Sequence, residues 1–279
     1  MAKESIDEIS QRANINHKIT SSKNVVIYED HRTILNVLFL LKEKQEIEEP
    51  LDLVMFDNHD DFCDPSPLAL KKVISFLKKP TKEKLYNIVE FDLNPLDDDW
   101  VKFGMELGLI GNVFLFNSDE SNVHFREEYI TKKFGTKYLY NLGDVWTALG
   151  YHGILNDPVK REYQQLLADF GWEFIEGKYR FSQNKRKYVF DIDLDCFSTR
   201  ILDKTIAIPE EIIIKRLTEL SYPSYHYYYT SQNFMKDLIK DSELVTLCYE
   251  NGCCGGIREA HKIFNMVDYV LFDNELGES

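Results

Sequence analysis

The sequence predicts an α/β protein of three layers, α/β/α, in which helices cover both faces of a mostly parallel sheet. Short apolar runs typical of buried strands alternate along the chain with segments whose apolar residues recur at helical spacing. Two of these runs end in alternating acidic residues, and parallel strands bring such ends to one ligand-binding edge. The 279 residues contain no repeat, low-complexity tract or linker, so we expect one domain over 1–279, with 1–22 as a short helix or loose arm.

Apolar spacing and capping residues place the elements of the first half of the chain. Ile34, Leu35 and Leu38 share one helical face. Pro67 interrupts the chain before the next helical pattern, and Thr81 suits the N-cap of another helix. We therefore expect strands at 24–28, 51–56, 113–116 and 137–142, and helices over 31–45, from 68 to about 79, from 81 and from 96 to 108.

The second half continues the alternation. The turn pair Glu176-Gly177 predicts a hairpin around it. Pro209 suits the first turn of a helix. The expected elements are a hairpin over 172–181, strands at 188–195, 244–249 and 268–272, and helices from 209 and over 232–240, with irregular chain and a helix between 144 and 170.

Charge and cysteine content exclude several classes of function. The net charge of −14 argues against a nucleic-acid partner, because phosphate binding requires a basic surface. It suits a cationic substrate. The five cysteines form no CxxC pair, so we expect reduced thiols and a cytoplasmic protein. No stretch is long and apolar enough to span a membrane, and the first residues do not resemble a signal peptide. Nothing in the sequence indicates an oligomeric state.

The first acidic motif follows the apolar run Leu51 to Phe56. In an extended chain, residues i, i+2 and i+4 point to one face, so Asp57, His59 and Asp61 project together where the strand ends. Two carboxylates and an imidazole that converge in this way are costly to bury unless a cation lies among them. The motif therefore indicates a divalent metal, with an ordinary acidic loop as the alternative.

Two further strand ends carry the same chemistry. Asp191, Asp193 and Asp195 alternate with apolar residues and share one face. His31 follows the apolar run that ends at Tyr28. The candidate metal ligands are thus His31, Asp57, His59, Asp61, Asp191 and Asp193. This number of oxygen and nitrogen donors suits two ions that share carboxylates, and the absence of thiolate favours Mn²⁺. Two such ions activate a shared water, so the predicted chemistry is hydrolysis.

These motifs resemble those of the arginase and agmatinase (ureohydrolase) superfamily. Asp57-Asn58-His59-Asp60-Asp61 resembles its Asp-Ala-His-x-Asp signature, Asp30-His31 its Gly-Asp-His motif, and Phe190-Asp191-Ile192-Asp193 its Ser-x-Asp-x-Asp motif, all in the superfamily's order. With Asp99-Trp100 and Gly108-Leu109-Ile110, the pattern resembles an arginase-like family that includes peptide arginases. These enzymes convert arginine residues of a ribosomal precursor peptide into ornithine and release urea.

The resemblance implies an arginase-like fold and a role for each residue. His31 and Asp61 bind one Mn²⁺, His59 and Asp193 bind the other, and Asp57 and Asp191 bridge the two. Glu250 holds the guanidinium of an arginine-containing peptide substrate. No residue matches the proton-shuttling histidine securely, and His152 and His226 are the candidates. The catalytic residues implied are therefore Asp61, His152 and Glu250.

The sequence departs from the superfamily at several loops. Tyr28-Glu29 replace the glycines before Asp-His, and no proline follows Asp195-Cys196. These differences speak against free arginine and fit a larger substrate. The alternatives are a deacetylase-like hydrolase of amides or other C–N bonds, and an arginase-like protein that binds peptide without turnover. Asp193-Leu194-Asp195-Cys196-Phe197 also resembles a motif of lesion-bypass polymerases, which are longer and basic, unlike this chain.

Overall fold

The computed structural model describes residues 15–21, 23–45, 47–94, 98–117, 126–141, 172–175, 178–181, 187–218 and 231–277. The central sheet has eight strands, which are β1 (Asn16–Ile19), β2 (Asn24–Tyr28), β3 (Leu51–Asp57), β4 (Ile110–Asn117), β5 (Arg126–Ile130), β6 (Thr136–Asn141), β9 (Tyr188–Asp193) and β12 (Leu244–Cys248). Their order across the sheet is β1-β2-β12-β9-β3-β4-β6-β5. All neighbours from β2 to β6 are parallel, and only the edge strands β1 and β5 pair antiparallel.

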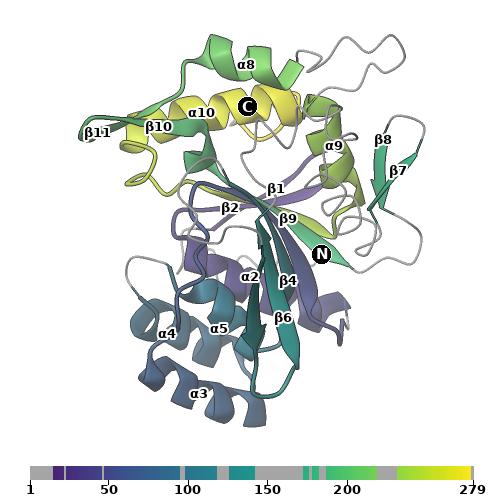
Figure 1. The fold of residues 1–279 in the computed structure, drawn as a ribbon, viewed down its shortest axis with the longest axis vertical. Coiled ribbons are helices and arrows are strands. Elements are labelled where there is room, and N and C mark those ends of the chain that lie inside the picture. The colour runs from purple at the N-terminus through teal and green to yellow at the C-terminus, as the bar shows by residue number, and fades with distance from the viewer. Residues whose placement is uncertain are drawn as a thin grey trace.

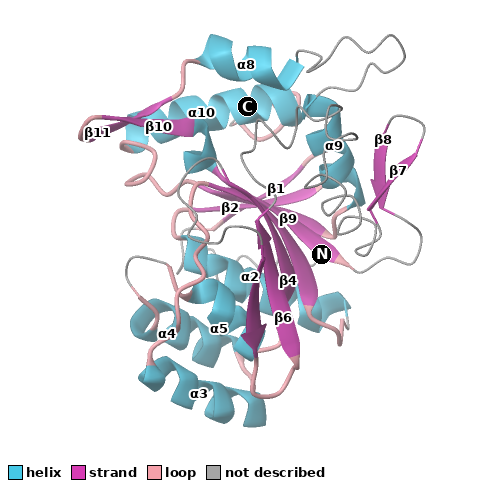
Figure 2. Ribbon diagram, in the orientation of Figure 1, coloured by secondary structure: helices cyan, strands magenta, loops and turns pink. Residues whose placement is uncertain are grey.

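Helices cover the two faces of this sheet, as Figure 1 shows. One layer contains α2 (Ile34–Gln45), α3 (Pro67–Lys78), α4 (Lys82–Asp92) and α5 (Trp100–Glu106). The other contains α8 (Glu210–Thr218), α9 (Ser231–Asp241) and α10 (Ile257–Leu271). Figure 2 separates these helices from the strands by colour. Among the described helices, none is both long and apolar enough to cross a membrane.

The buried strand β3 explains why two helical layers are needed. Its seven residues are all buried. Leu53 and Met55 pack in the core beneath α2 to α5, whereas Val54 and Phe56 pack in the core on the α8 to α10 side. A strand that is apolar on both faces is stable only when both faces are covered. The predicted three-layer α/β class is therefore confirmed.

Short elements complete the described chain. Two small antiparallel hairpins lie outside the central sheet: β7 (Trp172–Ile175) with β8 (Lys178–Phe181), and β10 (Ser198–Ile201) with β11 (Lys204–Ala207). The 3₁₀ helix η1 (His31–Thr33) begins three residues after the end of β2, and η3 (Leu194–Phe197) directly follows β9. The predicted N-cap Thr81 is confirmed, because its side chain accepts a hydrogen bond from Lys84 N before α4. Ser66 caps α3 in the same way and accepts a hydrogen bond from Ala69 N.

Three predictions about elements were wrong or incomplete. Residues 16–19 form the edge strand β1 rather than a helix or loose arm. Residues 268–271 end the helix α10, where Ile263, Val267 and Val270 lie on its buried side. A short apolar run fits a strand or a buried helix equally well. Here the helical pattern of the preceding residues continues through it. The strand predicted over 188–195 ends at Asp193, where η3 begins.

The order of the strands brings four chain segments to one edge. β2, β12, β9 and β3 are consecutive neighbours and all parallel, so their carboxyl ends lie together. The segments that leave these ends carry His31, Glu250, Asp195 and Asp57. In open parallel sheets this edge is where ligands bind.

A candidate metal centre

The imidazole of His31 lies at the middle of an acidic cluster. This side chain is fully buried, and its Nδ1 atom lies 3.4 Å from Asp57 Oδ2, 3.2 Å from Asp61 Oδ2 and 3.3 Å from Asp193 Oδ2. Glu250 Oε1 follows at 3.7 Å. The Nδ1 atom nevertheless has no hydrogen-bond partner, and neither does Oδ2 of Asp57 or of Asp193. Three chain segments thus aim unsatisfied donor atoms at one point, and Asp61 and Glu250 lie beside them.

Asp191 orients His31 from the opposite side of the ring. Its Oδ2 lies 2.7 Å from His31 Nε2. Its Oδ1 accepts hydrogen bonds from Thr246 Oγ1 at 2.5 Å and from Tyr28 Oη at 3.1 Å. A carboxylate that holds the far nitrogen of a histidine is the usual support of a metal-binding imidazole. Asp191 therefore directs Nδ1 of His31 into the cluster.

Three carboxylates of the cluster are each held through one of their two oxygens. Backbone amides donate to one oxygen of each: His59 N to Asp57 Oδ1 at 2.7 Å, Asp195 N to Asp193 Oδ1 at 3.0 Å, and Asn58 N to Asp195 Oδ1 at 3.1 Å. The Oδ2 atoms of all three are buried and accept no hydrogen bond. Each carboxylate is thus fixed by the backbone through one oxygen, and its other oxygen remains available to a cation.

The second half of the cluster is built around His59. Its Nδ1 lies 3.0 Å from Asp195 Oδ2 and 3.8 Å from Asp57 Oδ1. Asp57, Asp193 and Asp195 also form a group whose oxygens lie within 4.8 Å of one another. Asp57 and Asp193 therefore belong both to the His31 half and to the carboxylates beside His59.

Two cysteine thiols lie at the cluster, one beside the His31 half and one beside the His59 half. Cys248 groups with His31, Asp193 and Glu250, and Cys253 groups with His59, Asp195 and Glu250, with ligand atoms within 4.8 Å in each group. Burial, with the surrounding carboxylates, raises the pKa of both thiols. Without a cation beside them they are neutral thiols at neutral pH, so neither is an activated nucleophile.

The electrostatics show that the cluster is costly without a cation. Burial and then the charges of Asp61, Asp193 and Asp195 raise the pKa of Asp57 well above its usual range. Burial and then Asp195 raise the pKa of Asp193 to about 7. Burial lowers the pKa of His31, but Asp191, Cys248 and Asp193 together raise it, and the net pKa is well above the usual range. Like charges that are buried together need a positive partner, and here protons take that place.

The spacing of the donor atoms fits a divalent cation. An ion bound at about 2.1 Å by neighbouring ligands keeps them roughly 3.0 to 3.4 Å apart, whether the arrangement is octahedral or tetrahedral. The oxygens of Asp57, Asp61 and Asp193 lie 3.2 to 3.4 Å from His31 Nδ1. Together with the orphaned donor atoms, this spacing makes the described residues a candidate metal site.

The third motif is arranged around both histidines of the cluster. Asp191 was expected to bridge two ions and Asp193 to bind one of them. In the structure Asp191 Oδ2 faces His31 Nε2, Asp193 Oδ2 faces His31 Nδ1 and Asp195 Oδ2 faces His59 Nδ1. Asp191 and Asp193 lie on β9 and Asp195 on η3, so alternation along a strand does not by itself tell which of the three side chains would hold an ion.

The other predicted residues fall into two sets. His31, Asp57, His59, Asp61 and Glu250 all lie in the cluster. The shuttle candidates His152 and His226 lie outside the described residues. Sequence reasoning missed Asp195, Cys248 and Cys253, although Asp195 shows the same alternation as Asp191 and Asp193. The two thiols had no signal in the sequence, because only the sheet order places β12 between β2 and β9.

Trp100 supports the cluster from the helical layer. Its Nε1 donates to Asp61 Oδ2 at 2.5 Å, and its ring lies 4.6 Å from the ring of His31. Asp61 and Glu250 both have positive φ values, 47° and 32°, which are uncommon for residues other than glycine. Such conformations concentrate at functional sites, where the surrounding structure imposes them.

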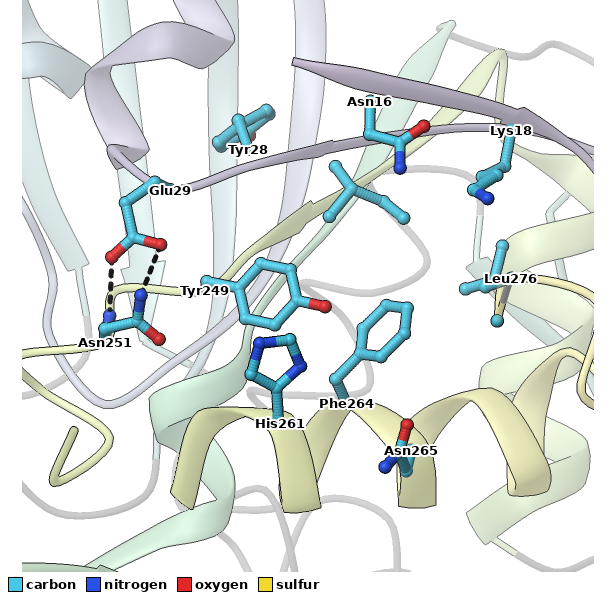
Figure 3. Close-up of a pocket in the computed structure, with 12 residues that line it drawn as sticks. Asn16, Lys18, Tyr28, Glu29, Tyr249, Asn251, His261, Phe264, Asn265 and Leu276 are labelled. Atoms are coloured by element: carbon cyan, nitrogen blue, oxygen red, sulfur yellow. Dashed lines mark hydrogen bonds between the residues drawn. The ribbon is translucent and has the colours of Figure 1, made fainter. Parts of the chain in front are cut away.

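A pocket of about 530 Å³ is lined by residues of β1, β2 and α10 and of the turn after β12. Figure 3 shows Tyr249, His261 and Phe264 along one wall, with Asn16 and Lys18 across from them. Glu29 also lines it and is held by Asn251, whose backbone N and side-chain Nδ2 donate to its two oxygens at 3.1 and 2.6 Å (Figure 3). Glu29 is close in sequence to His31, and Asn251 directly follows Glu250. The pocket and the cluster therefore share two chain segments.

No family model matches the chain, and no curated protein matches it.

Proposed function

We propose that this protein is a hydrolase that holds two divalent ions and removes urea from arginine side chains within a peptide. The observation that carries the proposal is the set of orphaned donor atoms of His31, Asp57, Asp193 and Asp195, at the carboxyl ends of the parallel strands β2, β3 and β9. One position would be lined by His31, Asp57, Asp61 and Asp193, and the other by His59 and Asp195 with Asp57. Asp193 groups with Asp57 and Asp195 beside the second position. The donor set suits Mn²⁺, with thiols nearby that also admit softer ions.

The chain's own residues provide the remaining requirements of such a reaction. A divalent ion, when bound, makes a water molecule nucleophilic near neutral pH. Asp191 keeps His31 oriented, and the backbone amides keep three carboxylates oriented, so the ligands need little rearrangement. Glu250 lies beside the ligands with its side chain 12% exposed, so it is placed to pair with a guanidinium that approaches from solvent.

The pocket lined by Glu29 and Asn251 suits a peptide better than free arginine. Its volume exceeds what a single guanidino group fills, and it begins one residue beyond Glu250. The wall formed by Tyr249, His261 and Phe264 offers apolar contact to residues that flank an arginine (Figure 3). The acidic chain, with a net charge of −14, attracts a cationic substrate.

Urea release tests this function. The full chain is stripped of metal, reloaded with Mn²⁺, and offered free arginine and a panel of arginine-containing peptides. We expect urea from peptides, dependent on Mn²⁺, and little from free arginine. Glu250→Gln should keep its metal content and lose most of the turnover, because the amide is neutral. If the Mn²⁺-loaded protein releases no urea from any substrate but cleaves acetylated lysine peptides, the proposal fails in favour of amide hydrolysis.

A further inference from the structure

We propose that Cys253 is a ligand for a thiophilic divalent cation, such as Zn²⁺ or Cd²⁺, on the His59 side of the metal centre. Nδ1 of His59, a carboxylate oxygen each of Asp195 and Glu250, and Sγ of Cys253 lie within 4.8 Å of one another. They supply one nitrogen, two oxygens and one sulfur, which are all donor types that Zn²⁺ binds, in its usual number of four.

The chain geometry directs these side chains together. The turn after β12 is closed by hydrogen bonds from Cys253 N and Cys254 N to Glu250 O, at 2.8 and 3.1 Å. This turn returns Cys253 to the neighbourhood of Glu250. Asp195 approaches from η3 after β9, and His59 from the loop after β3. Three separate segments therefore converge on one point.

An orphaned buried atom marks this point as a ligand position. Asp195 is fully buried, and its Oδ1 is held by Asn58 N at 3.1 Å. Its Oδ2 accepts no hydrogen bond and lies 3.0 Å from His59 Nδ1. A buried carboxylate oxygen without a donor is destabilising, and a cation shared with His59 removes that cost.

The thiol determines which cation is preferred. Mn²⁺ and other hard ions gain little from sulfur, whereas thiolate strongly favours Zn²⁺ and its heavier analogue Cd²⁺. Cys253 is exposed, so an ion reaches it from solvent. Cys248, in the other half of the centre, is buried and its Sγ donates to Glu29 O at 3.4 Å. The two halves therefore differ in their access to a soft ligand.

Occupation of this position has a consequence for turnover that depends on the proposed function. An ion bound by Cys253 also engages Glu250, which would otherwise receive the guanidinium. A thiophilic cation would then compete with substrate rather than support catalysis. The binding itself is independent of any activity.

Cadmium titration of the metal-stripped full chain tests the inference. We expect Cd²⁺ alone to produce an ultraviolet thiolate-to-metal charge-transfer band that saturates at one thiolate-bound ion per chain. Cys253→Ser should lose the band while the far-ultraviolet circular dichroism stays unchanged. Cys63→Ser is the matched control, because Cys63 is also exposed but belongs to none of the ligand groups among the described residues, and its band should persist.

Two outcomes would overturn the inference. One is the absence of a charge-transfer band in the unmodified protein. The other is a band that survives Cys253→Ser and disappears with Cys248→Ser, which would place the soft ligand in the His31 half. Neither outcome depends on urea release, so Mn²⁺-dependent turnover without a cadmium band would reject this inference and leave the proposed function standing.

Discussion

At the scale of single residues, Asp191 and Asp193 of strand β9 differ in their hydrogen-bond partners. Asp191 is satisfied by three partners: His31, Thr246 and Tyr28. Asp193 keeps one oxygen without a hydrogen bond, directed at His31 Nδ1. An oxygen that already accepts its hydrogen bonds supports a ligand, while an orphaned one is available to a cation.

Substitution of each aspartate by asparagine tests whether it binds an ion or supports a ligand. Asp193→Asn should remove a shared ligand, so the protein should retain at most one ion after dialysis against Mn²⁺. Asp191→Asn should keep the capacity for two ions and lower affinity on the order of 10- to 100-fold, because His31 loses its charged partner. Metal content and affinity can be measured by elemental analysis and calorimetry. Equal loss of capacity in both variants would restore the predicted register, in which Asp191 bridges.

At the scale of elements, the helix α5 contributes to the centre without supplying a ligand. All seven of its residues are buried. Trp100, its first residue, donates to Asp61 and lies against the ring of His31. A large aromatic side chain with one donor can satisfy a carboxylate and still fill the core. The packing of α5 therefore controls the position of two candidate ligands.

Trp100→Phe tests this dependence. Phenylalanine keeps a ring beside His31 but cannot donate to Asp61, so we expect Mn²⁺ affinity to fall by about tenfold. Phe103→Leu is the control, since Phe103 lies on the same helix and is buried in the core. It should cost roughly 1 kcal/mol of unfolding free energy and leave metal affinity unchanged. If both variants lower affinity equally, Trp100 acts through general packing alone.

At the scale of the whole molecule, the centre joins strands from both ends of the chain. β2 and β3 lie early in the sequence, and β9 and β12 lie late, yet they are neighbours in the sheet. A cation bound here would connect them through side chains as well as backbone. An ion that binds only the folded state stabilises it in proportion to its occupancy.

The stability of the metal-free protein should fall as pH rises. Burial raises the pKa of Asp193 from 3.8 to about 7, and the contact with Asp195 raises the pKa of His59 from 6.5 to about 9. For both groups the folded protein binds more protons than the unfolded chain, so their contribution declines between about pH 4 and 7 for Asp193 and between about 6.5 and 9 for His59.

Thermal unfolding with and without metal measures this effect. The metal-stripped protein should unfold at a lower temperature at pH 9 than at pH 6. Saturating Mn²⁺ should raise the unfolding temperature more at pH 9 than at pH 6, because the ion and the protons compete for the same ligands. A metal-free unfolding temperature that rises over this pH range would contradict the assigned role of the cluster.

The sequence by itself determined the layers of the fold and most of the cluster. Alternating apolar runs and helical patterns require a covered parallel sheet, and a strand end exposes residues i, i+2 and i+4 on one face. This periodicity predicted that Asp57, His59 and Asp61 gather at the strand end, and in the structure Asp57 and Asp61 lie beside His31 while His59 lies beside Asp57. The strand itself places only Asp57, because β3 ends there and Asp61 has a positive φ of 47°, so the conformation of the following loop brings in the other two side chains.

Only the tertiary structure decided which aspartates face the two histidines and which residues join them. A shift of two residues leaves a side chain on the same face, so Asp191, Asp193 and Asp195 are equivalent in any pattern of alternation. How close each of these carboxylates lies to His31 depends on the register of β9 with β12 and β3. Likewise, Cys253 and Glu250 reach the centre because β12 lies between β2 and β9, and strand order is a property of long-range packing that local sequence does not encode.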